Sequence, residues 1–251
     1  MFARTESKIR LAVLLAILAS WEIVGRFLID PAVFAPPSRV LVAWWPTFAG
    51  NPKLESALLT AIVELVIAFA LAVAVGIAIG VAVGISDFGR MTLFPFVLLA
   101  WGLPQVVFLP LVILIFGIGP ASRIAFGFTH GVLPIIVNTV AGMRNVNPLY
   151  LASARAGGAS RSQILRHIIF PNMVATVFTG LRLAMTLTLL GVILAELFVS
   201  SNGIGSYTQL FAETFKPASL LSLVLTLAVM AVVFNELVRL IESRFTRWRQ
   251  D

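Results

Sequence analysis

The chain has 251 residues, of which 59% are hydrophobic and only 12% are charged, and its mean hydropathy is +1.01. A soluble domain carries about 25% charged residues, so this composition excludes an ordinary soluble protein and indicates an integral membrane protein. The net charge of +7 could suggest a nucleic-acid partner, but the membrane topology derived below explains it more simply, and none is expected. The absence of cysteine excludes disulfides and thiolate metal sites.

The first predicted element is an apolar run at residues 11–29, which follows a polar and basic segment. This combination is also typical of a signal peptide. No A-x-A cleavage site lies between residues 11 and 35, and the run is long enough to span a bilayer. We therefore expect an uncleaved first helix. The proline-rich residues 30–56 are expected to form a loop with a short interfacial helix at Trp44 and Trp45.

The second predicted span covers residues 58–85. Small residues recur in it at every fourth position: Ala68, Ala72, Gly76, Gly80 and Gly84. Repeats of this kind allow helix backbones to approach closely in lipid. We expect tight packing inside the membrane and assign this helix no chemistry.

The third and fourth predicted spans are residues 93–118 and 122–143. The third contains Pro95, Pro104 and Pro110, and it also carries Gln105. Broken helices are tolerated where protein or a water-filled cavity satisfies the freed backbone groups, so this span is a candidate lining of a solute pathway. The fourth span carries His130 and Asn138.

The fifth and sixth predicted spans are residues 174–200 and 220–241. Arg182 and Glu196 lie in the fifth. A turn at residues 201–205 and an outer loop or short helix at residues 206–217 connect the two spans. The sequence thus predicts an all-α membrane protein with six transmembrane helices in a single domain, residues 1–251.

The longest segment that mixes charged and apolar residues is 147–171, between the fourth and fifth spans. Asn147 and Pro148 suit the start of a helix, and Gly157-Gly158 suits its end. Ser160 and Gln163 have the spacing of a capping box, which predicts a second helix. The pattern alone fits an amphipathic loop on the membrane surface equally well.

This segment resembles the EAA loop of ABC-importer permeases, whose pattern is E-A-A, three residues, G, nine residues and I-x-L-P. Ala152-Ser153-Ala154 stands for E-A-A, and Gly158, Ile168 and Pro171 match the glycine, isoleucine and proline. The sequence departs from the pattern at Ala152, where the family has glutamate. The resemblance implies a type I importer permease fold and a loop that docks into a cytoplasmic ATPase. The implied docking residues are Ala152, Ser153, Ala154, Arg155, Gly158, Ala159, Ile164, Leu165, Ile168 and Pro171.

Two further segments extend the resemblance over roughly residues 31–240. Residues 34–40 and 142–146 are similar to segments of the nitrate, sulfonate and taurine branch. Riboflavin and thiamine-pyrimidine importers use closely similar permeases, so these substrates stay open as alternatives. The resemblance also implies a second permease copy, an extracytoplasmic solute-binding protein, and ATP with Mg²⁺ bound on the ATPase, with no cofactor on this chain.

The distribution of Lys and Arg predicts the orientation independently of the resemblance. With the N-terminus inside, twelve of the 18 basic residues fall in cytoplasmic segments and four (Arg39, Lys53, Arg123 and Lys216) fall outside. Both termini and residues 147–171 are therefore expected to be cytoplasmic. The resemblance to importer permeases implies that the membrane is the inner membrane of a bacterium.

The sequence lacks the common catalytic motifs. None of the three lysines follows a glycine, so there is no phosphate-binding loop for ATP, and the two histidines are too far apart for H-E-x-x-H. We expect no catalytic residues and no metal site. A self-sufficient secondary carrier and a membrane anchor without a pathway are the alternatives to an importer subunit.

Polar residues inside predicted spans are candidate functional residues, since burying a charge in hydrocarbon costs roughly 2.5–3.5 kcal/mol. We expect Glu22 and Glu64 to pair with Arg26 or to lie at span ends. For Glu196 a packing or gating role is favoured over contact with an anionic solute. The pathway candidates are Gln105, His130, Asn138, Arg182 and Glu196.

Overall fold

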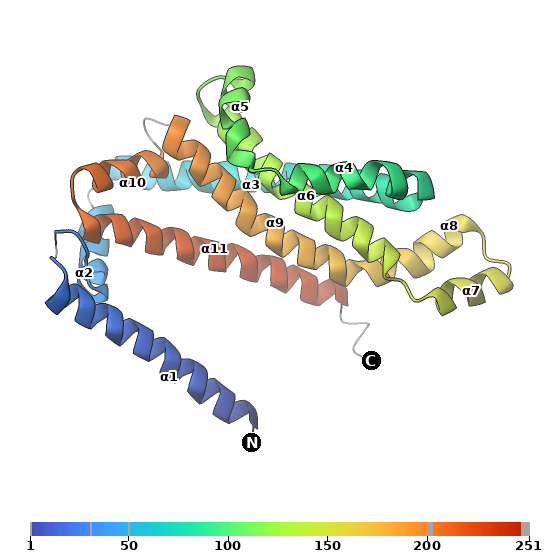
Figure 1. Cartoon of the computed structure of the whole chain (residues 1–251), viewed down its shortest axis with the longest axis horizontal. Helices are drawn as coiled ribbons and strands as arrows, with labels where there is room; N and C mark the ends of the chain where they lie inside the picture. The colour runs from blue at the N-terminus through green and yellow to red at the C-terminus, as the bar shows by residue number, and fades with distance from the viewer. Residues whose placement is uncertain (1, 31, 50, 200–202, 247–251) are drawn as a thin grey trace. The chain divides into compact units, whose positions relative to one another are not determined.

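The computed structural model describes residues 2–30, 32–49, 51–199 and 203–246, and within these ranges every regular element is a helix (Figure 1). The α-helices are α1 (Phe2–Ile23), α2 (Pro37–Phe48), α3 (Pro52–Ile85), α4 (Phe94–Gly102), α5 (Leu109–Phe116), α6 (Pro120–Arg144), α7 (Pro148–Ala156), α8 (Arg161–Ile164), α9 (Phe170–Val199), α10 (Ile204–Glu213) and α11 (Pro217–Thr246). Shorter turns of π-helix, η1 (Val24–Leu28), η2 (Gly89–Leu93) and η4 (Leu165–Ile169), and a 3₁₀ turn, η3 (Gln105–Phe108), join some of them.

Five helical segments in the described ranges are long and apolar enough to cross a bilayer: Lys8–Leu28, Pro52–Ile85, Pro120–Arg144, Arg161–Val199 and Pro217–Phe245. They overlap five of the six predicted spans. The short helices expected around Trp44 and after the fifth span are present as α2 and α10. Residues 201 and 202 of the predicted turn lie outside the described residues.

The predicted third span is not one straight helix. Gly89–Gly102 and Gln105–Phe116 meet at a bend of 89°. The backbone is extended at Leu103 and Pro104, where the proline lacks the N–H that would continue the helix. Pro95 and Pro110 cause no break, because they lie in the first turns of α4 and α5, where a backbone N–H has no helical partner. The expected break is therefore confirmed at one proline, and the two segments taken together as one broken span make the sixth.

The fifth span is longer than predicted. It is one helical segment from Arg161 to Val199 that contains the π-helical turn η4 and Pro171. The second helix of segment 147–171 is therefore the beginning of this span rather than a separate element. The wide turn Leu165–Ile169 directly precedes α9 and places Pro171 near its start. A proline ring is accommodated where the regular hydrogen-bond ladder is already interrupted.

The chain divides into two compact parts. The first comprises the described residues of 1–59 and 201–229, and the second those of 60–200 and 230–251. In the first part, the Trp44 indole donates a hydrogen bond of 2.9 Å to the Thr226 hydroxyl, which joins α2 to the beginning of α11. Glu22 pairs with Arg26, as expected, and its carboxylate also accepts from the backbone N–H of Ser38 at 3.0 Å. Assignment of all 251 residues to a single domain stays a prediction.

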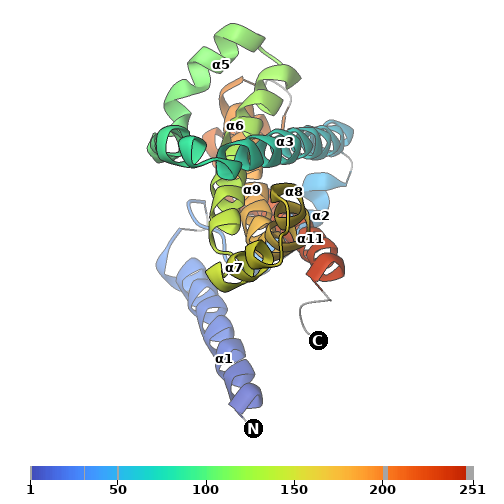
Figure 2. The same cartoon turned by 90° about the vertical axis from the view of Figure 1, so that its right-hand side faces the viewer.

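The second part is built on the antiparallel pair α6 and α9, which pack along their lengths (Figure 1). Glycines permit this approach. A Cβ built on Gly127 would lie 2.5 Å from a methyl of Val192, and one on Gly180 would lie 2.5 Å from Asn138. Figure 2 shows α6 and α9 again together, with the α7–α8 hairpin at their end.

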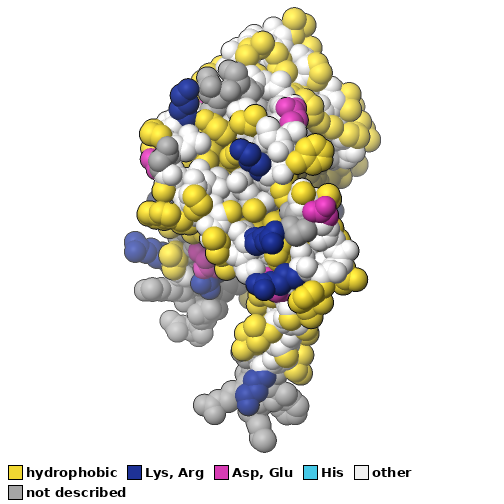
Figure 3. Space-filling view, turned by 90° about the vertical axis from the view of Figure 1, so that its left-hand side faces the viewer, with side chains coloured by type: hydrophobic (Ala, Val, Ile, Leu, Met, Phe, Trp, Pro, Cys, Tyr) yellow, Lys and Arg dark blue, Asp and Glu magenta, His cyan; other side chains and the backbone are white. Residues whose placement is uncertain are grey.

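Helix α3 packs on α6 through the predicted stripe of small residues. A Cβ on Gly76 would lie 2.8 Å from Ile135, and one on Gly80 would lie 2.5 Å from Thr139. Ala68 and Ala72 are fully buried. The expectation of close intramembrane packing is thus confirmed. Many large hydrophobic side chains of the described residues are exposed. Figure 3 shows one face of the molecule, on which hydrophobic side chains lie among isolated charged ones.

Candidate functional site

The segment between α6 and α9 forms a hairpin that its own capping residues define. The Asn147 side chain accepts a hydrogen bond of 2.9 Å from the backbone N–H of Leu149, which starts α7. Gly158 follows α7 with a φ of +78°, a conformation that favours glycine. Ser160 and Gln163 form the predicted capping box. The backbone N–H of Gln163 donates to the Ser160 hydroxyl at 3.3 Å, and the backbone N–H of Ser160 donates to the Gln163 side-chain oxygen at 2.7 Å. These local predictions are confirmed.

The residues proposed for docking fall into two groups in the structure. Ala152, Ser153, Arg155 and Gly158 are exposed on the hairpin. Ile164 is buried, and Leu165 packs against the core of the second part. Because a buried side chain cannot reach a partner, Ile164 serves to hold the hairpin on the helix bundle. Ala154, Ala159, Ile168 and Pro171 are half-buried.

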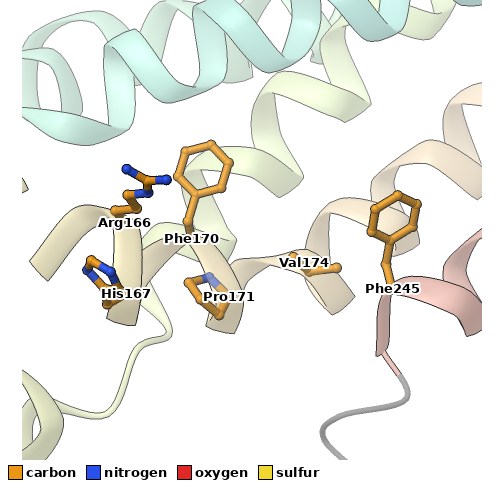
Figure 4. A pocket seen from close by; sticks show the side chains of 6 residues that line it. All are labelled: Arg166, His167, Phe170, Pro171, Val174 and Phe245. Carbon is orange, nitrogen blue, oxygen red and sulfur yellow. The ribbon is translucent and has the colours of Figure 1, made fainter. Parts of the chain in front are cut away.

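A shallow groove of about 470 Å³ lies beside this hairpin. Its lining comes from the α8–α9 junction and from the end of α11, as Figure 4 shows: Arg166, His167, Phe170, Pro171, Val174 and Phe245. The Phe170 and Phe245 side chains are 46% and 58% exposed, which is a considerable apolar surface next to two basic groups. The groove extends the exposed surface of the hairpin toward α11.

The pathway candidates are not brought together at one place. His130 is buried in α6, where its Nδ1 lies 3.0 Å from the carbonyl of Phe126. Asn138 is half-buried and donates 2.8 Å to the carbonyl of Pro134. Arg182 lies 3.3 Å from Glu242 of α11, and its side chain is 40% exposed. Gln105 lies at the bend between α4 and α5, and its buried Oε1 accepts no hydrogen bond from the described residues.

The most heavily buried charges form a network of three residues that sequence analysis did not assemble. Arg123 of α6 lies 3.0 Å from Glu64 of α3 and 3.4 Å from Glu196 of α9. The three side chains are only 9%, 3% and 0% exposed, respectively. Arg123 is therefore not an outer-loop charge, and the partner of Glu64 is Arg123 rather than Arg26. One guanidinium ties three helices together at the end of the bundle opposite the α7–α8 hairpin.

A depth argument could have found this network in the sequence. Arg123 begins the fourth predicted span, Glu64 lies near the start of the second, and Glu196 lies near the end of the fifth. Consecutive spans run in opposite directions, so the three charges share one side of the membrane. Since unpaired charges are costly in hydrocarbon, opposite charges at equal depth are expected to pair.

Comparison with known proteins decides the family. Residues 72–247 match the family described as binding-protein-dependent transport system inner membrane component. The chain belongs to this family. It is 30% identical to the taurine transport system permease protein TauC of Escherichia coli K12 over 96% of this chain and 88% of that protein. It is 29% identical to the putative aliphatic sulfonates transport permease protein SsuC of the same organism, over 92% of this chain and 88% of that one.

The fold is also that of a known importer permease. A chain of the inward-facing MetNI methionine ABC transporter superposes with a TM-score of 0.63 at 15% identity, covering 78% of this chain and 95% of that chain. The predicted type I permease fold is confirmed. The protein is thus a multi-pass inner-membrane permease subunit of an ABC importer, and membership of this family implies a solute-binding protein and an ATPase as partners.

Within the described residues the permease shows no group of three His, Asp or Glu side chains placed to hold a metal ion. Its two distinctive features are the capped hairpin α7–α8 at one end of the α6–α9 pair and the Glu64–Arg123–Glu196 network at the other.

Proposed function

We propose that two copies of this permease form the membrane pathway for a small organic or inorganic anion of the sulfonate, taurine or nitrate class. The observation that carries this proposal is the similarity to taurine and sulfonate permeases, which extends over 96% and 92% of the chain. Likeness over nearly the whole length includes the pathway and the loops, rather than a shared motif alone. Riboflavin and a thiamine-pyrimidine precursor are the alternative solutes.

The hairpin α7–α8 is the proposed docking site for the ATPase. Its exposed residues Ala152, Ser153 and Gly158 would face the partner, with Ala154, Ala159 and the groove of Figure 4 beside them. Arg155, the remaining exposed residue of the predicted set, lines a cavity of the permease itself. Ile164 and Leu165 would transmit the movement, because they attach the hairpin to the bundle. ATP and Mg²⁺ are bound by the partner, whose closure moves the hairpin and rocks the spans from inward-open to outward-open.

This mechanism requires the hairpin and both termini to be cytoplasmic, and the basic residues support that orientation. Placing Arg123 inside the bundle leaves three outer basic residues, Arg39, Lys53 and Lys216. The inside excess is therefore larger than the sequence alone indicates.

Among the pathway candidates, exposure favours Asn138 and Arg182 as groups that meet the solute. His130 and Glu196 are buried against neighbouring helices, so we assign them to packing. Arg182 would offer a guanidinium to an anion, although Glu242 shares its charge. The unpartnered Oε1 of Gln105 at the α4–α5 bend is a further candidate contact.

Reconstitution with the cognate ATPase and solute-binding protein tests the substrate. Uptake into proteoliposomes would be measured for taurine, a longer alkanesulfonate, nitrate, riboflavin and a formylaminopyrimidine. We expect saturable uptake of a sulfonate such as taurine or of nitrate, with riboflavin and the formylaminopyrimidine at background. Uptake confined to riboflavin or the pyrimidine would overturn the proposed substrate class but leave the importer mechanism intact.

A further inference from the structure

A second cavity lies between the α7–α8 hairpin and the elbow that joins α3 to α4. Its volume is about 690 Å³. One wall is the elbow, with Ile85, Asp87 and Arg90, and the other is the hairpin with the beginning of the α9 span, with Arg155, Arg161 and Ile164.

The elbow wall is held rigidly. The Ser86 hydroxyl accepts a hydrogen bond of 2.9 Å from the backbone N–H of Gly89. A Cβ on Gly89 would lie 2.5 Å from the carbonyl of Val83, so no side chain fits there. Arg90 pairs with Asp87 and also donates 3.2 Å to the carbonyl of Gly84, which fixes its guanidinium at the cavity wall. This side of the cavity is therefore preformed.

The hairpin wall carries unbalanced positive charge. Arg155 ends α7 and Arg161 begins α8, on either side of the glycine turn. Neither guanidinium has a hydrogen bond or ion pair within the described residues, whereas the charge of Arg90 is balanced by Asp87. The cavity thus has a net excess of two positive charges, contributed by two different helices.

The rim of the elbow is strongly apolar. Ile85, Phe88 and Met91 are 54%, 70% and 80% exposed, and they flank the basic cavity directly along the chain. A ligand that satisfies both features carries an oxyanion beside hydrocarbon. Clusters of Arg at the cytoplasmic ends of membrane helices have this chemistry and attract anionic headgroups.

We propose that this cavity binds the phosphate headgroup of an anionic phospholipid, with Arg155 and Arg161 contacting the phosphate and the acyl chains lying along Ile85, Phe88 and Met91. A bound headgroup would hold the hairpin against the α3–α4 elbow. Because the same hairpin is the proposed ATPase docking site, the lipid would set how firmly that site is positioned. The inference rests on the proposed function for its cytoplasmic orientation.

Lipid retention tests the site. The permease, alone and with its ATPase, is purified from nanodiscs of phosphatidylcholine with phosphatidylglycerol, and bound lipid is quantified by native mass spectrometry. The variant R155Q/R161Q is compared with R144Q/R244Q, which removes two exposed arginines outside the cavity. Each basic residue near an anionic surface contributes about 1 kcal/mol, so the cavity variant should bind phosphatidylglycerol roughly thirtyfold more weakly. The control removes the same number of cytoplasmic charges, so it should bind phosphatidylglycerol more tightly than R155Q/R161Q, and the difference between the two variants measures the cavity.

Each alternative occupant has its own outcome. Displacement of the lipid by millimolar inorganic phosphate, with equal binding of the free ion, would show a soluble-oxyanion site and overturn the lipid proposal. Equal retention by R155Q/R161Q and the wild type would also overturn it. Loss of ATPase assembly in R155Q/R161Q with unchanged lipid binding would show that the arginines meet an acidic surface of the ATPase. Because lipid is measured on the permease alone as well, failure to recover an ATPase would count against the proposed function only.

Discussion

The guanidinium of Arg123 lies 3.0 Å from the carboxylate of Glu64. The two side chains belong to different spans, and they are only 9% and 3% exposed, respectively. Glu196 completes the network at 3.4 Å. Neither oxygen of Glu64 accepts a well-aligned hydrogen bond from the described residues. One buried positive charge therefore stabilises two carboxylates, and its loss should cost more than the loss of either partner.

Arg123→Met should destabilise the permease strongly, because two buried carboxylates would face each other without a cation. Removal of one partner of a buried pair costs about 3–5 kcal/mol. The measurement is thermal unfolding in mild detergent, with Arg39→Met, at an exposed position outside the network, as control. The triple change E64L/R123M/E196L should recover most of the stability, since apolar replacement of a whole buried network is often neutral. An R123M variant that unfolds with the wild type would show that the network contributes nothing.

Gly80→Ala should loosen the contact of α3 with α6. The added Cβ would lie 2.5 Å from Cβ of Thr139 and 3.2 Å from the carbonyl of Ile136, so a helix must shift. Overpacking of this kind costs about 1–3 kcal/mol. Gly102→Ala is the matched control, since a Cβ there meets nothing within 4 Å. Equal unfolding temperatures for the two variants would argue against close packing of α3 on α6.

Gly158→Ala should reduce coupling more than Gly157→Ala. The two glycines are adjacent, but only Gly158 has a positive φ, of +78°. An L residue in that conformation costs about 1–2 kcal/mol. A methyl group would clash at neither position: a Cβ on Gly158 would meet nothing within 4 Å, and one on Gly157 would lie 3.5 Å from the carbonyl oxygen of Ser153, which is ordinary contact. The readout is binding-protein-stimulated ATPase activity at equal membrane abundance. Gly158→Asp adds a charge at the docking surface and should uncouple transport further. Normal transport by that variant would refute a docking role for this turn.

Gln163→Ala should fray the start of the α8–α9 span without unfolding the bundle. It removes the side chain that accepts from the backbone N–H of Ser160 at 2.7 Å. Loss of a cap costs about 1 kcal/mol, so amide exchange in residues 161–165 should rise severalfold. Exchange in α6 should stay unchanged, which separates a local effect from global destabilisation. Ser162→Ala, an exposed change in the same turn, is the control.

Local signals in the sequence predicted the hairpin well, because its caps depend on residues within three positions of each other. Asn147, Gly158, Ser160 and Gln163 all act as expected. The 89° bend at Pro104 was predicted only as a break, since the direction of α5 depends on its packing against Phe126, Ala195 and Val199.

Long-range relationships were the part that sequence reasoning missed. Arg123 pairs with residues 59 and 73 positions away, as Glu64 and Glu196 lie on other helices. The length of the fifth span was underestimated for a related reason. Arg161, Arg166 and His167 make its first turns polar, so hydropathy alone places its start near residue 174.

The central claim is that this chain is moved by an ATPase that docks on α7–α8. The most direct measurement is solute uptake by proteoliposomes that contain the tagged permease and whatever co-purifies with it from its native membrane. The account predicts that an ATPase co-purifies with the permease in stoichiometric amount. It also predicts that uptake needs the solute-binding protein and ATP on the side of the membrane where the ATPase lies. A chain that purifies alone as a stable oligomer and moves solute without ATP would contradict it and establish a secondary carrier.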